Sequence, residues 1–374
     1  MKTVTKLGAR LALPLIAAAT LLTATGPQVA AADPTDFPAG YTGYHTYAEM
    51  TADLQSVAAK YGAGTAKNIT RLRNIGDSFE GRPIWSLKIS DHPNQDENEP
   101  EILIECNMHA REHLTAEQCL YFVHLLTDNY KKSTALGKRV TRIVNTHEFF
   151  IIPMLNPDGA MYDISDGVFH GWRKNRQTFS YSDKVGIDPN RNWSYMWGCC
   201  GGSSAKPGSA RYRGAYPFES VEDQVLRDFI QSRVVNGVQQ IKEILNVHSY
   251  GEHVLYPYGY THATTDANMT LDDHNAFLAM AQKMASLNGY KAMQGSKMYI
   301  YDGDFIDWAW ATQHIFAFTW ELYPKWGCGC GGFHPPDSSI QAQTSRNLDA
   351  ALYLFEQADC PYREAGLTSY CSVP

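Results

Sequence analysis

The sequence predicts a single α/β domain in which a mixed, mostly parallel central sheet carries helices on both faces. Short apolar runs typical of buried strands alternate with longer segments that have helical apolar spacing. The chain has 374 residues, 44% hydrophobic and 19% charged, which is enough for one large core. Three polar residues, His109, His248 and Glu321, each come just past a predicted strand. Because sites in open α/β sheets form beyond the carboxyl ends of the strands, these residues predict one site.

The strands and helices alternate along most of the chain. A helix over 116–130 is predicted because Leu120, Val123, Leu125 and Leu126 share one face. The other predicted helices cover 219–232, 271–287 and 340–355. The predicted strands cover 84–89, 101–106, 149–154, 242–247 and 315–320. Strand–helix alternation of this length is typical of an α/β sheet.

The two ends of the chain are expected to differ from the folded domain. Residues 1–32 combine a basic start, a short apolar stretch and small residues before a cleavage point. This pattern is typical of a secretory signal peptide and is too short for a membrane span. We expect a short leader at 33–40, the domain at 41–357 and a disulfide-held tail at 358–374. The protein is therefore expected to be secreted.

Export makes disulfides the default state of the eight cysteines. A four-cysteine zinc site in two Trp-Gly-Cys loops is the alternative. It is disfavoured because adjacent cysteines cannot easily place both sulfurs on one tetrahedral metal. The expected pairs are Cys106 with Cys119, Cys360 with Cys371 and, from one Trp-Gly-Cys loop to the other, Cys199 and Cys200 with Cys328 and Cys330.

Charge and hydropathy exclude some classes of partner. The net charge is −7 and the isoelectric point is about 6.0. No basic cluster follows a helix face, so nucleic acid is not an expected partner. No segment after the leader is apolar enough to cross a bilayer. We expect the protein to be a monomer.

The segment Met108–His113 carries the main chemical signal. His109 and Glu112 stand three residues apart after an apolar run, so both can reach one zinc ion, and His248 is a candidate third ligand. Three protein ligands leave one coordination position open, which is typical of catalytic zinc. The alternative is an inverted His-x-x-Glu-His motif with His109 and His113 as ligands and Glu112 as base. That alternative needs both histidines on one helix face, whereas His109 follows a strand.

Several further motifs occur in a fixed order. Together they resemble the zinc metallocarboxypeptidases of the carboxypeptidase A/B type, the funnelins, over nearly the whole chain after residue 44. The segments 302–304 and 323–324 look most like bacterial carboxypeptidase T. The resemblance implies a carboxypeptidase A-like, phosphorylase/hydrolase-type sandwich. The motifs are Met108–Glu112, Leu155–Gly159, Trp172–Arg176, Asp188–Trp193, His248–Tyr250, Tyr256–Gly259 and Phe318–Glu321.

The resemblance also implies a role for each matching residue. His109, Glu112 and His248 match the zinc ligands. Glu321 matches the general base that takes a proton from zinc-activated water, and Arg173 matches the arginine that stabilises the oxyanion. The matching substrate-binding residues are Arg111, Asn190, Arg191, Ser249, Tyr250, Tyr299, Asp304 and Ile306.

Some of these matches bear on specificity. Asn190 and Arg191 match the pair that holds the terminal carboxylate of the substrate, which makes the enzyme an exopeptidase. Tyr299 matches a tyrosine that closes over the terminal residue, with Tyr301 as the alternative. Ile306 favours apolar side chains and Asp304 adds an acid, so we expect mixed hydrophobic and basic specificity. The alternative is that Asp304 is turned away and only caps a turn. 

An acidic loop provides a second metal expectation. Asp91, Asp96, Glu97, Glu99 and Glu101 are close together, and oxygen-rich loops can bind calcium. Because similar loops bind calcium in carboxypeptidase T, the resemblance implies calcium near Asp96, Glu97 and Glu101. A solvated charged loop is the alternative.

The function expected from these observations is a secreted, monomeric zinc carboxypeptidase that acts on the C-termini of peptides and proteins. Two alternatives remain at this point. One is a cell-wall peptide carboxypeptidase of the same fold. The other is an inactive peptide-binding homologue, which an intact Glu321 and Arg173 argue against.

Overall fold

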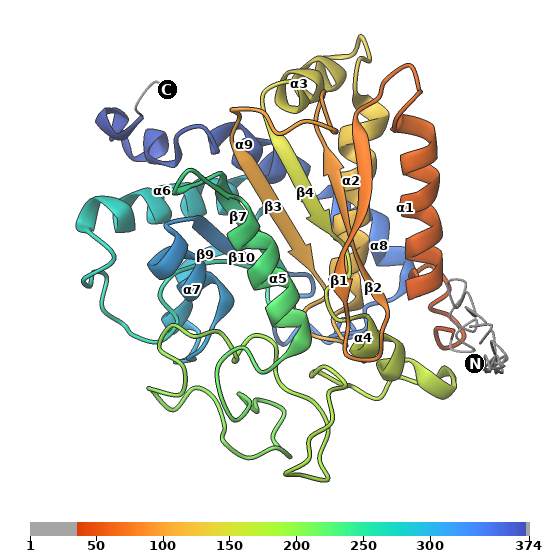
Figure 1. Ribbon diagram of the computed structural model, residues 1–374, viewed down its shortest axis with the longest axis vertical. Coiled ribbons are helices and arrows are strands. Elements are labelled where there is room, and N and C mark those ends of the chain that lie inside the picture. The colour runs from red at the N-terminus through yellow and green to blue at the C-terminus, as the bar shows by residue number, and fades with distance from the viewer. Residues whose placement is uncertain (1–35, 372–374) are drawn as a thin grey trace, which may run out of the picture. The chain divides into compact units, whose positions relative to one another are not determined.

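An eight-stranded mixed sheet forms the centre of the computed structural model, which describes residues 36–371 (Figure 1). The strand order is β1-β2-β4-β3-β7-β10-β8-β9. The central neighbours β4, β3, β7 and β10 are parallel, and so are β8 and β9, whereas the pairs β1–β2, β2–β4 and β8–β10 are antiparallel. The predicted mixed, mostly parallel sheet is therefore confirmed. The strands are β1 Thr70–Asp77, β2 Pro83–Ile89, β3 Glu101–Cys106, β4 Glu148–Ile152, β7 Ile241–Ser249, β8 His253–Tyr256, β9 Lys291–Gln294 and β10 Phe316–Leu322, and a separate hairpin pairs β5 Val234–Val235 with β6 Val238–Gln239.

Helices cover both faces of this sheet, as predicted. The side chains of α5 and the first half of α7 pack into one apolar core, whereas those of α1, α2, α3, α6 and α9, together with Trp310 of α7, pack into the other. Figure 1 shows α5 crossing in front of the strands. Ile102 and Ile104 of β3 point into the second core and Leu103 points into the first, so the central strands are buried on both faces. The helices are α1 Tyr47–Tyr61, α2 His113–Asn129, α3 Ala135–Val144, α4 Pro157–Asp163, α5 Val221–Ser232, α6 Leu271–Asn288, α7 Phe305–Gln313, α8 Ile340–Ser345 and α9 Leu348–Gln357.

The two ends of the chain are described only in part. The expected signal peptide, residues 1–32, lies outside the described residues. The tail after α9 forms two short 3-10 helices, Pro361–Ala365 and Thr368–Tyr370, and Tyr362 anchors it by donating a hydrogen bond to Asp273 of α6. Within residues 36–371, no helix has the length and apolarity needed to span a bilayer.

The expected disulfides are half confirmed. Cys106 pairs with Cys119 and Cys360 pairs with Cys371. The expected link from one Trp-Gly-Cys loop to the other is wrong, because each of these loops closes a disulfide within itself. The two loops are anchored to different parts of the fold: the backbone N–H of Cys200 donates to Asp302, and the indole of Trp326 donates to the carbonyl oxygen of Tyr250. The pairs within the loops are Cys199–Cys200 and Cys328–Cys330.

Candidate active site

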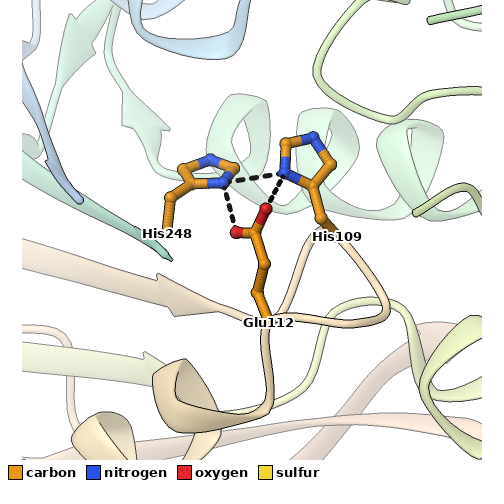
Figure 2. Close-up of side chains that lie close together, drawn as sticks. All are labelled: His109, Glu112 and His248. Carbon is orange, nitrogen blue, oxygen red and sulfur yellow. Dashed lines mark hydrogen bonds and ion pairs between the residues drawn. The ribbon is translucent and has the colours of Figure 1, made fainter. Parts of the chain in front are cut away.

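Two histidines and a carboxylate converge at the carboxyl end of the central strands (Figure 2). His109 and Glu112 lie in the turn between β3 and α2, and His248 lies near the end of β7. Nδ1 of His109 is 2.8 Å from Oε1 of Glu112, and Nδ1 of His248 is 3.0 Å from Oε2. The two Nδ1 atoms are 3.0 Å apart. All three side chains are buried.

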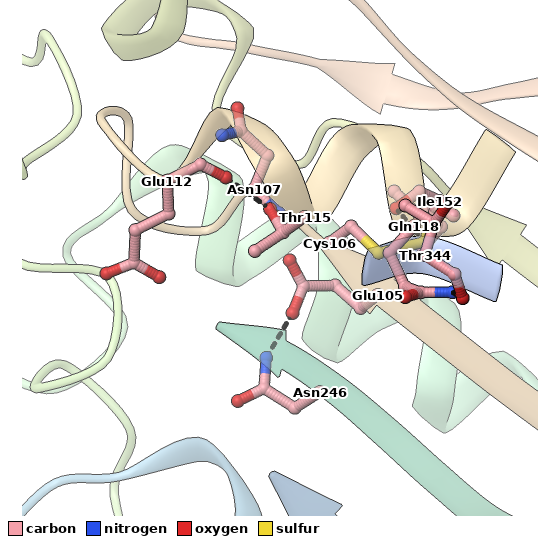
Figure 3. Close-up of a disulfide and its surroundings, with 10 residues drawn as sticks. Glu105, Cys106, Asn107, Glu112, Thr115, Gln118, Ile152, Asn246 and Thr344 are labelled. Atoms are coloured by element: carbon pink, nitrogen blue, oxygen red, sulfur yellow. Dashed lines mark hydrogen bonds between the residues drawn. A yellow bond between two sulfur atoms is a disulfide. The ribbon is translucent and has the colours of Figure 1, made fainter. Parts of the chain in front are cut away.

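The turn that carries His109 and Glu112 is held in a single shape by local bonds. Asn107 adopts a left-handed conformation with φ 55°, and its backbone N–H donates to the hydroxyl of Thr115 at 2.9 Å. That hydroxyl donates in turn to the carbonyl oxygen of Glu112 at 2.7 Å. The disulfide of Cys106, the last residue of β3, with Cys119 on α2 closes the same turn (Figure 3). The side chain of Glu112 makes no cap for α2, so it is free to face the histidines.

The far sides of both imidazoles are bonded, which sets the direction of their Nδ1 atoms. Nε2 of His109 lies 3.1 Å from Oδ1 of Asp188, and Nε2 of His248 lies 2.7 Å from Oδ1 of Asn246. With Nε2–H as donor in each case, both Nδ1 lone pairs face each other and the carboxylate. Such an arrangement is unfavourable without a cation between the donors. Two imidazoles and one carboxylate with bonded outer sides are a donor set that fits zinc.

Glu321 enters the same place from the neighbouring strand. β7 and β10 are parallel, and their register sets Glu321 opposite His248. Both residues line one small cavity of about 30 Å³. Burial and the nearby Glu112 carboxylate raise the pKa of Glu321 to about 7, while His248 and Arg173 oppose the shift. Glu321 thus stands across the cavity as an acid or base.

Arg173 also lines this cavity and is held by Asp188. Nε of Arg173 donates to Oδ2 of Asp188 at 2.9 Å, and its Nη1 lies 3.9 Å from Glu112. Burial raises the pKa of Asp188, but Arg173 and His109 outweigh it and hold that pKa well below its usual range. Asp188 therefore orients a metal-ligand candidate and a cation at once. The sequence motif Asp188–Trp193 includes this residue, but no role was predicted for it. The signal that could have found it is a carboxylate two residues before Asn190.

Arg191 is a buried cation whose guanidinium is not fully hydrogen-bonded within the described residues. Its Nη2 donates to the Tyr299 hydroxyl at 3.2 Å, and its Nη1 donates to the carbonyl oxygen of Asn190. Nε of Arg191 is buried and has no hydrogen-bond partner within residues 36–371. Asn190 is held in place because its Oδ1 accepts the backbone N–H of Phe305 at 2.9 Å. Both residues line the cavity.

The wall of the cavity includes Asp304 but not Ile306. Asp304 is buried, lines the cavity and caps α7 by accepting the backbone N–H of Asp307 at 3.4 Å. Burial raises its pKa, and the charge of Arg191 opposes the shift. Ile306 is buried in the core that contains α5 and α7. Tyr299 and the alternative Tyr301 both line the cavity.

The remaining predicted substrate residues lie beside the histidine cluster. The Arg111 guanidinium lies 3.9 Å from the ring centre of Phe333, and the Tyr250 and Phe333 rings pack edge to face with their centres 4.9 Å apart. The backbone N–H of Ser249 donates to Oε2 of Glu112 at 3.0 Å. Ser249 therefore orients Glu112, whereas Arg111 and Tyr250 form a ledge around Phe333.

The alternative inverted motif is not formed, in agreement with the argument against it from the sequence. His113 does not join His109, because its Nε2 lies 2.9 Å from Asp163, so the inverted motif is not assembled.

The calcium site expected near Asp96, Glu97 and Glu101 is not supported either. Arg233 donates to both Asp96 and Glu101, and the Lys88 ammonium lies 3.4 Å from Asp96. Arg233 comes from far along the chain and Lys88 from strand β2, and their charges compensate those of Asp96 and Glu101.

Known proteins share this architecture. A family model described as zinc carboxypeptidase matches residues 51–350. A zinc carboxypeptidase of Saccharothrix mutabilis subsp. capreolus is 45% identical over 353 residues, covering 92% of this chain and 75% of its own. Human carboxypeptidase B is 32% identical over 318 residues, covering 84% of this chain and 70% of its own. The crystal structure of thrombin activatable fibrinolysis inhibitor matches with a TM-score of 0.74 and 27% identity, over 84% of this chain and 74% of the other.

Proposed function

Because the chain belongs to the zinc carboxypeptidase family, we propose that it removes single residues from the C-termini of peptides and proteins outside the cell. One observation supports binding of the C-terminal end of the substrate. The buried Arg191 lies beside the histidine cluster with Nε unpartnered among the described residues. A guanidinium fork donates two parallel hydrogen bonds to a carboxylate, and only the end of a peptide carries a backbone carboxylate.

The residues around the cavity divide the reaction between them. A zinc ion held by His109, Glu112 and His248 would supply a Lewis acid that polarises the scissile carbonyl and acidifies water. Glu321 takes a proton from the attacking water and passes it to the leaving amine. Arg173 donates to the carbonyl oxygen as negative charge develops on it, which is typically worth about 3 kcal/mol of barrier.

Arg191 and Asn190 hold the terminal carboxylate, and Tyr299 covers the terminal residue. The Tyr299 hydroxyl accepts a hydrogen bond from the same guanidinium, so it must give way to the carboxylate when substrate enters. Asp304 on the cavity wall supports a preference that includes basic as well as apolar terminal residues. Arg111 and Tyr250 extend the site toward residues further from the terminus. 

Secretion and a monomeric state are part of the same proposal. The N-terminal pattern over residues 1–32 and the disulfides of the domain support export.

The test uses two peptides that differ only at the end of the chain. A benzoylglycyl dipeptide with a free carboxylate should release its terminal amino acid, and its C-terminal amide should not, because the amide removes the charge that Arg191 binds. A chelator should abolish the release, and added zinc should restore it. Equal cleavage of acid and amide would contradict the assignment of Arg191. A library of peptides that differ only in the last residue then measures specificity.

A further inference from the structure

A second group of metal-ligating side chains lies next to the first and takes no part in the proposed reaction. His113 is the first residue of α2, Asp163 is the last residue of α4, and His334 lies in the loop between β10 and α8. One donor atom from each lies within 4.8 Å of the other two. We propose that His113, Asp163 and His334 bind a second divalent metal ion of the zinc class.

The donor atoms point to a shared centre. Nε2 of His113 lies 2.9 Å from Oδ2 of Asp163, and Nε2 of His334 lies 3.5 Å from the same oxygen. His113 and Asp163 are buried, and the side chain of His334 is 19% exposed. Two imidazole nitrogens and one carboxylate oxygen are the same donor types as in the catalytic cluster, and they suit zinc.

An ion pair alone accounts for only half of this arrangement. A hydrogen bond at 2.9 Å satisfies His113 and Asp163. Nε2 of His334 is buried and makes no hydrogen bond within the described part of the chain, and 3.5 Å is too long for a good one. A buried ring nitrogen without a partner is costly. A metal ion that shares the carboxylate would give this nitrogen its partner.

The surroundings hold the three ligands in place. Oδ1 of Asp163 accepts the backbone N–H of Trp172, which leaves Oδ2 for the metal. The Phe169 ring stacks on His334 with ring centres 3.7 Å apart, and the edge of Phe37 contacts His113 at 4.9 Å. Bonded outer oxygens and apolar walls are usual around metal ligands, because they fix ligand orientation and limit access of water.

The loop that carries His334 also reaches the substrate ledge. The preceding residue, Phe333, contacts both Arg111 and Tyr250. A metal bound to His334, His113 and Asp163 therefore ties the ledge to the helix that follows Glu112. This consequence rests on the proposed function, whereas the metal site itself does not.

The first experiment counts metal. The secreted holoenzyme is dialysed against micromolar free zinc, and zinc per chain is measured by elemental analysis. Two ions are expected in the wild type, one in His334→Gln and one in Asp163→Asn. The matched control is His170→Gln, an exposed histidine on a neighbouring loop, which should retain two. One ion in the wild type would overturn the proposal, and so would two ions in His334→Gln.

The second experiment separates this site from the catalytic one. His109→Gln should lose the catalytic ion and keep the second, so one ion remains although activity is lost. The loop over 326–336 should show slower amide hydrogen exchange at excess zinc in the wild type and no change in His334→Gln. No zinc in His109→Gln would overturn the second site. Activity of wild-type enzyme holding one ion reports on the proposed function independently.

Discussion

Glu321 is the carboxylate to which we assign the proton transfer. It faces the cavity opposite His248, and it does not belong to the donor set of the metal. Glu321→Gln keeps the shape but removes the base, so kcat should fall by about 10²–10⁴-fold. Zinc content, measured on the same samples, should stay that of the wild type.

The matched control for this prediction is Glu364→Gln, which changes an exposed carboxylate in the tail. It should leave kcat unchanged. A Glu321→Gln enzyme with wild-type kcat and normal zinc would remove Glu321 from the proton transfer.

Asp304 has two possible uses, and a single substitution distinguishes them. It lines the cavity and it also caps α7. Asp304→Asn retains a capping oxygen but loses the charge. If the charge selects basic substrates, kcat/KM for peptides ending in Arg or Lys should fall relative to peptides ending in Phe. Equal losses on both series, or none, would leave Asp304 as a cap only.

At the scale of the element, the turn between β3 and α2 carries two of the three proposed zinc ligands, His109 and Glu112. The Cys106–Cys119 disulfide encloses it and has a sequence separation of 13. Replacing both cysteines by Ala should lower the free energy of unfolding by about 3 kcal/mol, since the unfolded chain is no longer constrained. The same change should weaken zinc binding, because His109 and Glu112 lie inside the loop.

A second pair of cysteines provides the control. Replacing Cys360 and Cys371 by Ala opens the tail disulfide, whose sequence separation of 11 is similar. Denaturant unfolding should show a comparable loss of stability, but zinc affinity should remain that of the wild type. Weakened zinc binding in both double variants would mean that the effect is general.

The elements that sequence predicted well are those buried on both faces. β3, β4, β7 and β10 are apolar on both faces, which is typical of buried parallel strands. Their predicted bounds lie within a few residues of the observed ones. α1 was missed, although its capping box of Thr46 and Glu49 was visible in the sequence.

Other elements lacked a usable signal. β8 and the edge strand β9 have only four residues each. The helix predicted over 340–355 is divided into α8 and α9 around Arg346 and Asn347. 

Site residues could be predicted where a metal-binding or acidic side chain directly follows a strand. The orientation of a side chain within a turn could not be predicted as well. His109, His248 and Glu321 follow strands, so their convergence could be expected. His113 directly follows Glu112, yet the start of α2 directs it to Asp163. Arg233, which is far from the acidic loop in the sequence, pairs with Asp96 and Glu101 in that loop. No local sequence pattern could reveal such a long-range ion pair.

At the scale of the whole molecule, one buried carboxyl should make stability depend on pH. Glu243 of β7 is fully buried, and neither carboxyl oxygen has a hydrogen-bond partner within residues 36–371. Burial, with a smaller contribution from Asp359, raises the pKa of Glu243 well above 4.5. The folded state thus holds this proton more tightly than the unfolded state. The resulting stability is present below about pH 4.5 and is lost as pH rises toward the folded-state pKa.

Glu243→Gln has no such proton to lose. The free energy of unfolding of the variant should therefore exceed that of the wild type by an amount that grows as pH rises above about 4.5, with a slope of at most about 1.4 kcal/mol per pH unit. Differential scanning calorimetry across this range measures it. Glu364→Gln should run parallel to the wild type, and a constant offset for Glu243→Gln would show that the carboxyl is already ionised.

The pairing of Glu321 with His248 across β7 and β10 has a wider consequence. Two hydrogen-bonded strands cannot slide without breaking their whole ladder, so the spacing between these residues has no hinge. Arg111, Arg173, Tyr299 and Asp304 lie outside the sheet, on turns and helix ends. The preference for one terminal residue over another can therefore change through substitutions in these peripheral segments. The relative position of Glu321 and His248 stays fixed by the sheet.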